Sequence, residues 1–159
     1  MQYRILQEND ADFLTRIFSI PEYDTYFAEN DTTVEEWKDR LTLFETEHSY
    51  VISENDRDIG WIMYTICGDI CDLDIIVLLP RERNKGYGKE VFSDLIAKNP
   101  QVRMIKLDVQ QRNKSAVEFY KKLGFKVIGE ENQPVNGESV PYFNMTQIPN
   151  ALFRLNFVL

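Results

Sequence analysis

The spacing of apolar residues along the chain switches between two periods, which predicts alternating strands and helices. Alternation with a period of two, bounded by turn-forming residues, predicts strands at residues 2–6, 48–53, 59–66, 70–78, 102–109, 125–128 and 140–146. Apolar residues three and four positions apart predict four helices. The first ends before Pro21, the second runs from Thr33 to about Thr46, the third ends near Asn99, and the fourth runs from Asn113 to Gly124.

Local signals support these helix boundaries. Thr33 and Glu36 have the spacing of a capping box, and Asn113 is a favourable N-cap residue. Pro100 disfavours helical geometry in the residue before it, and Gly124 is a good C′ residue. The resulting order, β-α-α-β-β-β-α-β-α-β-β, predicts an α/β (α+β) fold. Its central sheet is expected to be mixed and mostly antiparallel, with helices on both faces.

The length of 159 residues fits one domain, which we expect to span residues 1–149. Residues 150–159 form an apolar C-terminal tail that either covers the core or pairs with a second copy, and the second alternative predicts a homodimer. The longest aliphatic run has five residues and ends at Pro80, too short to span a membrane. Because no basic leader with an apolar core is visible, we expect a cytoplasmic protein.

Charge is distributed unevenly along the chain. The net charge is −8, but residues 1–80 hold 18 acidic and 5 basic side chains, whereas residues 81–159 hold 8 and 13. Overall acidity argues against duplex nucleic acid as a partner, because phosphate binding needs clustered Lys and Arg. The first half suits a cationic partner and the second an anionic one, although an acidic surface also serves solubility.

The cysteines and the single histidine give no sign of a metal site. Cys67 and Cys71 flank a predicted turn, and His48 is the only histidine, so the chain offers too few ligands of the usual kinds. We therefore expect no metal, two reduced structural thiols, and a histidine that packs rather than catalyses.

The most informative segment runs from a predicted strand into a glycine-bearing loop that opens the third helix. Gly86 and Gly88 allow the backbone to bend closely around a ligand, and the amides of the first helical turn then favour an anion. Arg83, Lys85 and Lys89 add positive charge, so a phosphate is expected here. The glycine spacing fits neither a P-loop nor a dinucleotide fingerprint.

Two motifs identify a family resemblance. Arg83-Asn84-Lys85-Gly86-Tyr87-Gly88 matches the pattern Arg/Gln-x-x-Gly-x-Gly/Ala, and residues 113–125 match Asn-x-x-Ala-x-x-x-Tyr-x-x-x-Gly-Phe. In both respects the sequence resembles the GNAT superfamily of acyl-CoA-dependent N-acyltransferases. The resemblance covers residues 48–128 well, the N-terminal region only in its order of elements, and the tail not at all.

The resemblance implies acetyl-CoA as cosubstrate and a role for particular residues. Backbone groups of Ile76, Val77 and Leu78 would bind the pantetheine arm, and Asn113 would contact its end. Tyr120, on the same helix face as Asn113, would donate a proton to the departing thiolate; the alternative is a buried structural tyrosine. The pyrophosphate would be held by Arg83, Asn84, Lys85, Gly86, Tyr87, Gly88 and Lys89.

Three carboxylates are candidates for handling the amine. A primary amine is neutral at pH 7 in only about one molecule in 2,500, so a group must take its proton. Asp72 and Asp74 project from one face of the strand that leads to the loop, and Asp108 is a candidate for the same pocket. Asp74 is the preferred base, since its spacing to the loop resembles that in aminoglycoside 6′-N-acetyltransferases. The alternative is three ordinary surface carboxylates.

These features predict an N-acetyltransferase in which the amine attacks the thioester directly. The acidic first half, with Trp37 as a substrate-binding candidate, suits a cationic small amine such as an aminoglycoside or polyamine. A protein lysine or N-terminal amine is the alternative acceptor. A non-catalytic acyl-CoA-binding regulatory module is an alternative of another class.

Overall fold

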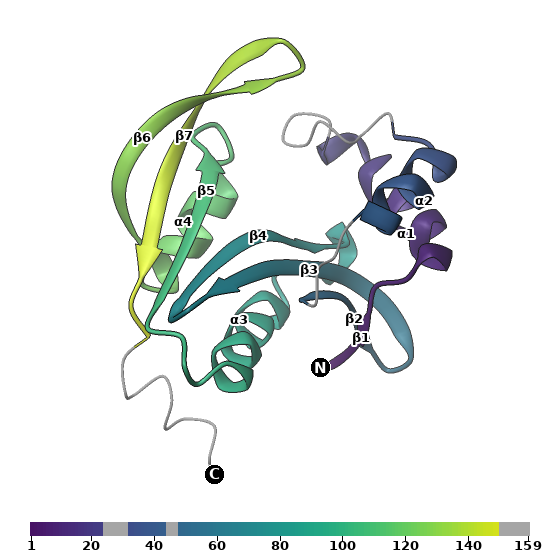
Figure 1. The fold of residues 1–159 in the computed structure, drawn as a ribbon, viewed down its shortest axis with the longest axis horizontal. Coiled ribbons are helices and arrows are strands. Elements are labelled where there is room, and N and C mark those ends of the chain that lie inside the picture. Colours follow the sequence, from purple (N-terminus) through teal and green to yellow (C-terminus); the bar gives the residue numbers. More distant parts are fainter. Residues whose placement is uncertain (24–31, 44–47, 150–159) are drawn as a thin grey trace.

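A seven-stranded sheet forms the centre of the protein (Figure 1). The structure is a computed structural model that describes residues 1–23, 32–43 and 48–149. The strand order is β1-β2-β3-β4-β5-β7-β6. β4 and β5 pair in parallel and the other neighbours pair antiparallel. The apolar tail and the homodimer contact expected from it lie outside the described residues.

The described elements confirm the order and the fold class that the sequence predicts. The strands are β1 (Gln2–Ile5), β2 (Ser49–Glu54), β3 (Arg57–Cys67), β4 (Ile70–Leu78), β5 (Met104–Gln110), β6 (Lys126–Val135) and β7 (Glu138–Gln147). The helices are α1 (Ala11–Phe18), α2 (Val34–Leu43), α3 (Tyr87–Lys98) and α4 (Lys114–Lys122), with 3₁₀ turns η1 (Glu8–Asp10), η2 (Pro21–Tyr23) and η3 (Pro80–Glu82). Within the described ranges, no helix has the length and apolar character needed to cross a bilayer.

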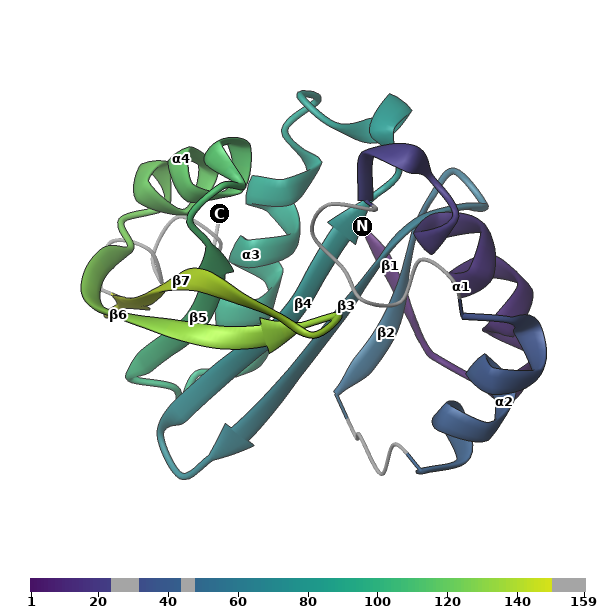
Figure 2. The same cartoon turned by 90° about the horizontal axis from the view of Figure 1, so that it is seen from above.

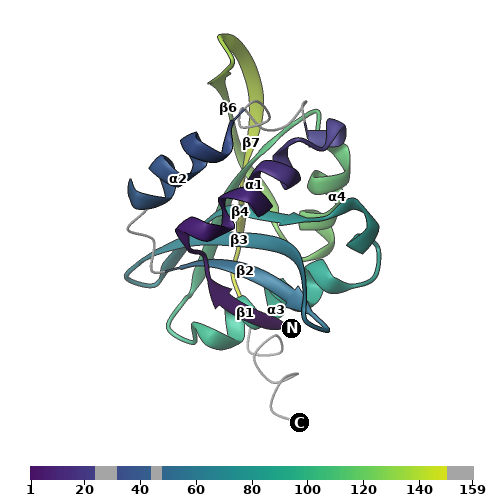
Figure 3. The same ribbon diagram turned by 90° about the vertical axis from the view of Figure 1, so that its right-hand side faces the viewer.

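The helices cover opposite faces of the sheet (Figures 2 and 3). A larger core lies under α3 and α4, and a smaller one lies between the sheet and α1 and α2. In the smaller core the rings of Phe18 and Trp37 stack with centroids 5.2 Å apart, and both meet the edge of Trp61. Trp37 is 1% exposed, which places this substrate-binding candidate in the core.

Side-chain caps set the beginnings of α2 and α4. The Thr33 amide donates to Glu36 Oε2 at 2.8 Å, and the Glu36 amide donates to Thr33 Oγ1 at 3.2 Å, so the predicted capping box is confirmed. Asn113 Oδ1 accepts from the Ala116 amide at 3.1 Å, which confirms the predicted N-cap. Both helices therefore begin where short-range hydrogen bonds satisfy their first amides.

The predicted extent of the last hairpin was wrong. β6 does not end at residue 128 but continues to Val135, where Asn136 and Gly137, with φ of 50° and 80°, turn the chain into β7. Glycine, glutamates and Pro134 give this segment poor strand propensity. It is a strand nonetheless because β6 is the edge of the sheet, where exposed polar residues and a proline are tolerated.

Gly60 allows β4 to lie very close to β3. A Cβ at this position would lie 2.3 Å from the Val77 carbonyl oxygen and 2.7 Å from Leu78 Cδ2. We expect Gly60→Ala to lower the free energy of unfolding by about 2–3 kcal/mol and the thermal midpoint by roughly 4–12 °C. Thermal unfolding followed by circular dichroism measures the effect.

Gly129→Ala is the matched control for this substitution. Its Cβ would approach only the Asn144 side chain, with the Oδ1 atom 3.0 Å away, and that side chain can move. We expect a smaller loss of stability than for Gly60→Ala. Equal losses for the two variants would contradict the steric argument at Gly60.

Candidate active site

β4 and β5 separate from each other halfway along the sheet. Their parallel pairing ends with Asp72 and Lys106. On the other side of β4, Leu73 pairs with Tyr64 and Ile75 pairs with Met63, so Asp74 is an extra residue in a β-bulge. The bulge bends β4 where its pairing with β5 ends. An opening lined by backbone groups therefore lies between the two strands.

Only part of the β4 backbone faces this opening. The Leu79 amide donates to the Ile59 carbonyl at 2.8 Å, and hydrogen-bonded pairs alternate along an antiparallel ladder. Val77 therefore pairs with Trp61, whereas the backbone groups of Ile76 and Leu78 point away from β3. Three residues are predicted to bind pantetheine through their backbone. Two of them, Ile76 and Leu78, direct their backbone N–H and C=O groups to the opening.

The Leu78 carbonyl already has partners within the chain. It accepts a hydrogen bond from the Tyr23 hydroxyl at 2.5 Å and one from Arg83 Nε at 3.3 Å. The Arg83 guanidinium also lies over the Tyr23 ring, 4.8 Å from its centroid. These contacts tie η2 and the predicted phosphate loop to the end of β4.

The loop before α3 has the backbone geometry that an anion site requires. Gly86 is the N-cap of α3 with φ of 89°, and Asn84 has φ of 60°. No side chain caps this helix, so its first amides stay available for a ligand. A Cβ on Gly88 would lie 3.0 Å from Phe119 Cζ, which explains why this position holds glycine. Tyr87, the first helical residue, packs against the larger core.

The basic residues of this loop differ in their partners. Lys85 Nζ lies 2.9 Å from Glu82 Oε2, and Arg81 Nε lies 3.4 Å from Glu82 Oε1. The hydrogen bond from Lys85 is the main cause that lowers the pKa of Glu82. Lys89 is exposed on the first turn of α3. Glu82 thus partly neutralises the loop, a feature that the sequence pattern did not reveal.

α4 positions the second motif on the same face of the sheet as α3. Because Asn113 Oδ1 caps the helix, its Nδ2 group remains as a donor. Tyr120 is partly buried and packs beside Phe119 and Phe125, with ring centroids 5.3 and 5.4 Å away. Burial raises the pKa of Tyr120, so its hydroxyl stays protonated at neutral pH.

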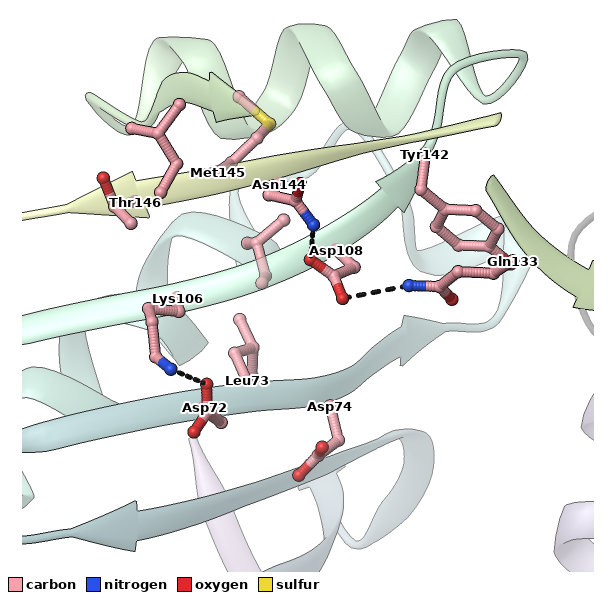
Figure 4. A pocket seen from close by; sticks show the side chains of 12 residues that line it. Asp72, Leu73, Asp74, Lys106, Asp108, Gln133, Tyr142, Asn144, Met145 and Thr146 are labelled. Atoms are coloured by element: carbon pink, nitrogen blue, oxygen red, sulfur yellow. Dashed lines mark hydrogen bonds and ion pairs between the residues drawn. The ribbon is translucent and has the colours of Figure 1, made fainter. Parts of the chain in front are cut away.

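The three predicted carboxylates line one pocket of about 550 Å³ (Figure 4). Leu73 and Leu107 belong to the core under α3 and α4. Because side chains alternate along strands, Asp72 and Asp108 project from the other face of the sheet, and Asp74, although it lies in the bulge, lines the same pocket. The carboxylates and Tyr120 therefore lie on opposite faces, and the opening between β4 and β5 separates them. Lys106, Gln133, Tyr142, Asn144 and Thr146 complete the polar lining.

Each carboxylate has different partners. Asp72 Oδ1 lies 3.1 Å from Lys106 Nζ, whereas Asp108 accepts from Asn144 Nδ2 at 2.8 Å and from Gln133 Nε2 at 3.1 Å. Burial is the main cause that raises the pKa of Asp74. A hydrogen bond from Thr65 Oγ1 at 3.4 Å lowers it, and the charge of Asp72 raises it again. Asp74 therefore accepts a proton more readily than an ordinary aspartate.

Sequence patterns missed five polar residues of the pocket, among them Thr146 of β7, and misplaced one candidate. Gln133, Tyr142 and Asn144 come from the β6–β7 hairpin, whose extent was underestimated, and Lys106 comes from β5. Alternation along residues 140–146 was the one signal that could have located Tyr142 and Asn144 on a common face. Trp37 is not among the residues that line the pocket.

The cysteines are free thiols with different environments. Cys67 is exposed and Cys71 is buried. Burial raises the pKa of the Cys71 thiol to about 12, so it is a poor nucleophile at neutral pH. Among the residues that the structure describes, no group of three or more His, Cys, Asp and Glu side chains is arranged to hold a metal ion.

Comparison with known proteins identifies the family of this chain. The sequence model of the acetyltransferase (GNAT) family matches residues 11–125. The chain belongs to this family and is an acetyl-CoA-dependent N-acetyltransferase that acts on an amine. Acetyl-CoA is the cosubstrate of the family.

Similar proteins act on different amines. The chain is 27% identical to the peptidyl-lysine N-acetyltransferase YjaB of Escherichia coli over 126 residues, covering 79% of this chain and 80% of that protein. Spermidine N-acetyltransferase from Vibrio cholerae, solved with CoA and spermine, shares the fold with a TM-score of 0.76, 18% identity and coverage of 92% and 94%. AAC(6′)-Ib, solved with ribostamycin and coenzyme A, has a TM-score of 0.77, 18% identity and coverage of 99% and 98%.

Proposed function

We propose that the protein transfers the acetyl group of acetyl-CoA to a primary amine of a cationic small molecule of the aminoglycoside or polyamine kind. The observation that carries this proposal is the pocket where Asp72, Asp74 and Asp108 meet beside the opening between β4 and β5. Its described lining holds three carboxylates and one ammonium group, that of Lys106. Such a pocket attracts cations.

The α3 loop and the opening fit acetyl-CoA, which supplies the acetyl thioester. The backbone of residues 83–89 and the free amides of α3 would hold its pyrophosphate, since Gly86 adopts a φ of 89° and no side chain blocks the helix end. Backbone groups of Ile76 and Leu78 would hydrogen-bond the pantetheine arm. Asn113 Nδ2 would donate to the same arm.

Two residues on opposite faces of the sheet handle the protons. Asp74, with its raised pKa, accepts the proton of the ammonium group directly or through one water, which leaves the amine nucleophilic. The amine nitrogen then bonds to the acetyl carbon, the carbon–sulfur bond breaks, and the nitrogen loses a second proton to water, which balances the proton that water later returns to Tyr120. Tyr120 donates its hydroxyl proton to the departing thiolate, and the Leu78 amide stabilises the oxyanion. No covalent enzyme intermediate is needed.

A protein lysine is the second candidate acceptor. The relative at 27% identity is named a peptidyl-lysine N-acetyltransferase, and a lysine side chain brings the same ammonium group to the carboxylates. A lysine brings one charge, however, whereas an aminoglycoside or polyamine brings several to an acidic pocket. The charge of the pocket therefore favours the small molecule.

Acetyl-CoA should stabilise the protein and serve as donor to cationic amines. At a concentration 100 times its Kd, it should contribute about 2.7 kcal/mol, which raises the thermal midpoint by roughly 5–10 °C. Thiol release is then measured with kanamycin, spermidine and lysine-bearing peptides, and with the N-acetylated form of each as control. Turnover of peptides alone would overturn the small-molecule proposal, and the lack of a thermal shift would overturn the assigned acetyl-CoA site.

A further inference from the structure

A series of hydrogen bonds orients the Tyr142 hydroxyl, one of two hydroxyl groups that the β6–β7 hairpin contributes to the pocket, the other being that of Thr146. Gln110, at the end of β5, lies opposite Tyr142 of β7 in the sheet register. Arg112 Nε donates to Gln110 Oε1 at 2.7 Å, and Gln110 Nε2 donates to the Tyr142 hydroxyl oxygen at 2.8 Å. Gln110, the middle member, is 4% exposed, whereas Arg112 is exposed and Tyr142 is partly buried.

Because Arg112 can only donate hydrogen bonds, it determines which atom donates and which accepts at each contact from Arg112 to Tyr142. A guanidinium group has donors and no acceptor, so the Gln110 amide must turn its oxygen to Arg112 and its nitrogen to Tyr142. The Tyr142 oxygen is therefore an acceptor in this contact. Its own proton must be donated to another group.

The proton of Tyr142 has no acceptor within the described part of the chain, and the side chain lines the pocket beside Asp108 and Gln133 (Figure 4). Both oxygens of Asp108 already accept from amides, Oδ1 from Asn144 and Oδ2 from Gln133. The pocket thus offers carboxylates for a cation on the β4 side and a hydroxyl donor on the hairpin side.

Resting on the proposed function, we infer that the acceptor carries an oxygen near its reacting amine and that Tyr142 donates a hydrogen bond to this oxygen. The pocket then selects hydroxylated amines, such as amino alcohols and amino sugars, over polyamines that contain no oxygen. When an amine without oxygen fills the pocket, it displaces water from the Tyr142 hydroxyl and offers no acceptor in its place, which costs binding free energy. Tyr142 is thus a specificity-determining residue.

Two amines that differ in one hydroxyl group test this inference. The preference is the kcat/KM for 1,3-diamino-2-propanol divided by that for 1,3-diaminopropane, measured by thiol release at one pH. We expect Tyr142→Phe to lower this preference about tenfold, the size expected for one neutral hydrogen bond. The two amines differ in intrinsic reactivity, but this difference is the same for every variant. It therefore cancels when the preference of a variant is divided by that of the wild type.

Gln110→Glu tests the same inference without changing Tyr142. A carboxylate at residue 110 still accepts from Arg112, but it also accepts from Tyr142 and turns the tyrosine proton away from the pocket. We expect it to lower the preference as Tyr142→Phe does. Tyr50→Phe, which removes a hydroxyl outside the pocket lining, should leave the preference unchanged.

The outcomes separate this inference from the proposed function. If Tyr142→Phe and Gln110→Glu change kcat/KM for both amines equally, the assignment of an oxygen to the acceptor is overturned and the small-amine function stands. If wild-type protein that is stabilised by acetyl-CoA acetylates lysine-bearing peptides but no small amine, both the inference and the proposed function are overturned. Thermal unfolding of each variant verifies that the fold is retained.

Discussion

Replacing Tyr120 by Phe is expected to lower kcat by about 10²–10⁴-fold, the usual contribution of a positioned general acid. The substitution keeps the ring that packs beside Phe119 and Phe125 and removes only the hydroxyl group. Within the described residues this hydroxyl forms no hydrogen bond, so its loss breaks no internal contact. Steady-state thiol-release kinetics with acetyl-CoA and a turned-over amine measure the effect.

The stabilisation by acetyl-CoA is the control for Tyr120→Phe. Acetyl-CoA should stabilise Tyr120→Phe as much as it stabilises the wild-type protein, because the Tyr120 hydroxyl acts on the leaving thiolate and not on the bound cosubstrate. Because burial raises the pKa of Tyr120, wild-type activity should also show no loss from tyrosine ionisation below about pH 10. An unchanged kcat in Tyr120→Phe would make Tyr120 a structural residue.

Asp74→Asn is expected to lower kcat/KM at neutral pH by at least about 10²-fold, because the amine then loses its proton acceptor. The free energy of unfolding should not decrease in this variant. The pKa of Asp74 is higher in the folded protein than in the unfolded chain, so its ionisation disfavours folding once the pH exceeds the unfolded value. Asparagine cannot ionise, so the variant should be as stable as the wild type at pH 7 or more stable.

The pH profile distinguishes a base from a residue that only attracts the amine. In the wild type, kcat/KM should fall on acidification through the raised pKa of Asp74, and this acidic limb should be absent in Asp74→Asn. Asp56→Asn is the matched control, since Asp56 sits in a turn with φ of 58°, which asparagine also adopts. An acidic limb that persists in Asp74→Asn would assign the base to another group.

Parts of the fold and of the candidate site could be predicted from short stretches of sequence. The capping box of Thr33 and Glu36 and the N-cap of Asn113 depend on side chains within three residues of the amides they satisfy. The glycine-bearing loop before α3 depends on the backbone freedom of Gly86, a property of that residue alone. Such features depend mainly on residues that are close together in the chain.

Other features required contacts between distant segments. β6 has a sequence of poor strand propensity and becomes a strand because β7 pairs with it at the sheet edge. Trp37 lies on a helix rich in acidic residues, yet its packing with Phe18 and Trp61 buries it. The apolar spacing of Trp37 and Leu41 indicated the inward face of this helix, but only the tertiary contacts show that Trp37 is fully buried.

By itself, the sequence determined the order of elements, the helix starts, the family motifs and the carboxylates that would share one strand face. These follow from residue type and from hydrogen bonds between near neighbours in the chain. The tertiary structure alone decided that Ile76 and Leu78 turn their backbone groups to the opening, that Asp72 pairs with Lys106, and that the hairpin contributes Tyr142 to the pocket. Strand register and the bulge at Asp74 set these contacts, and both depend on pairing between residues far apart in the sequence.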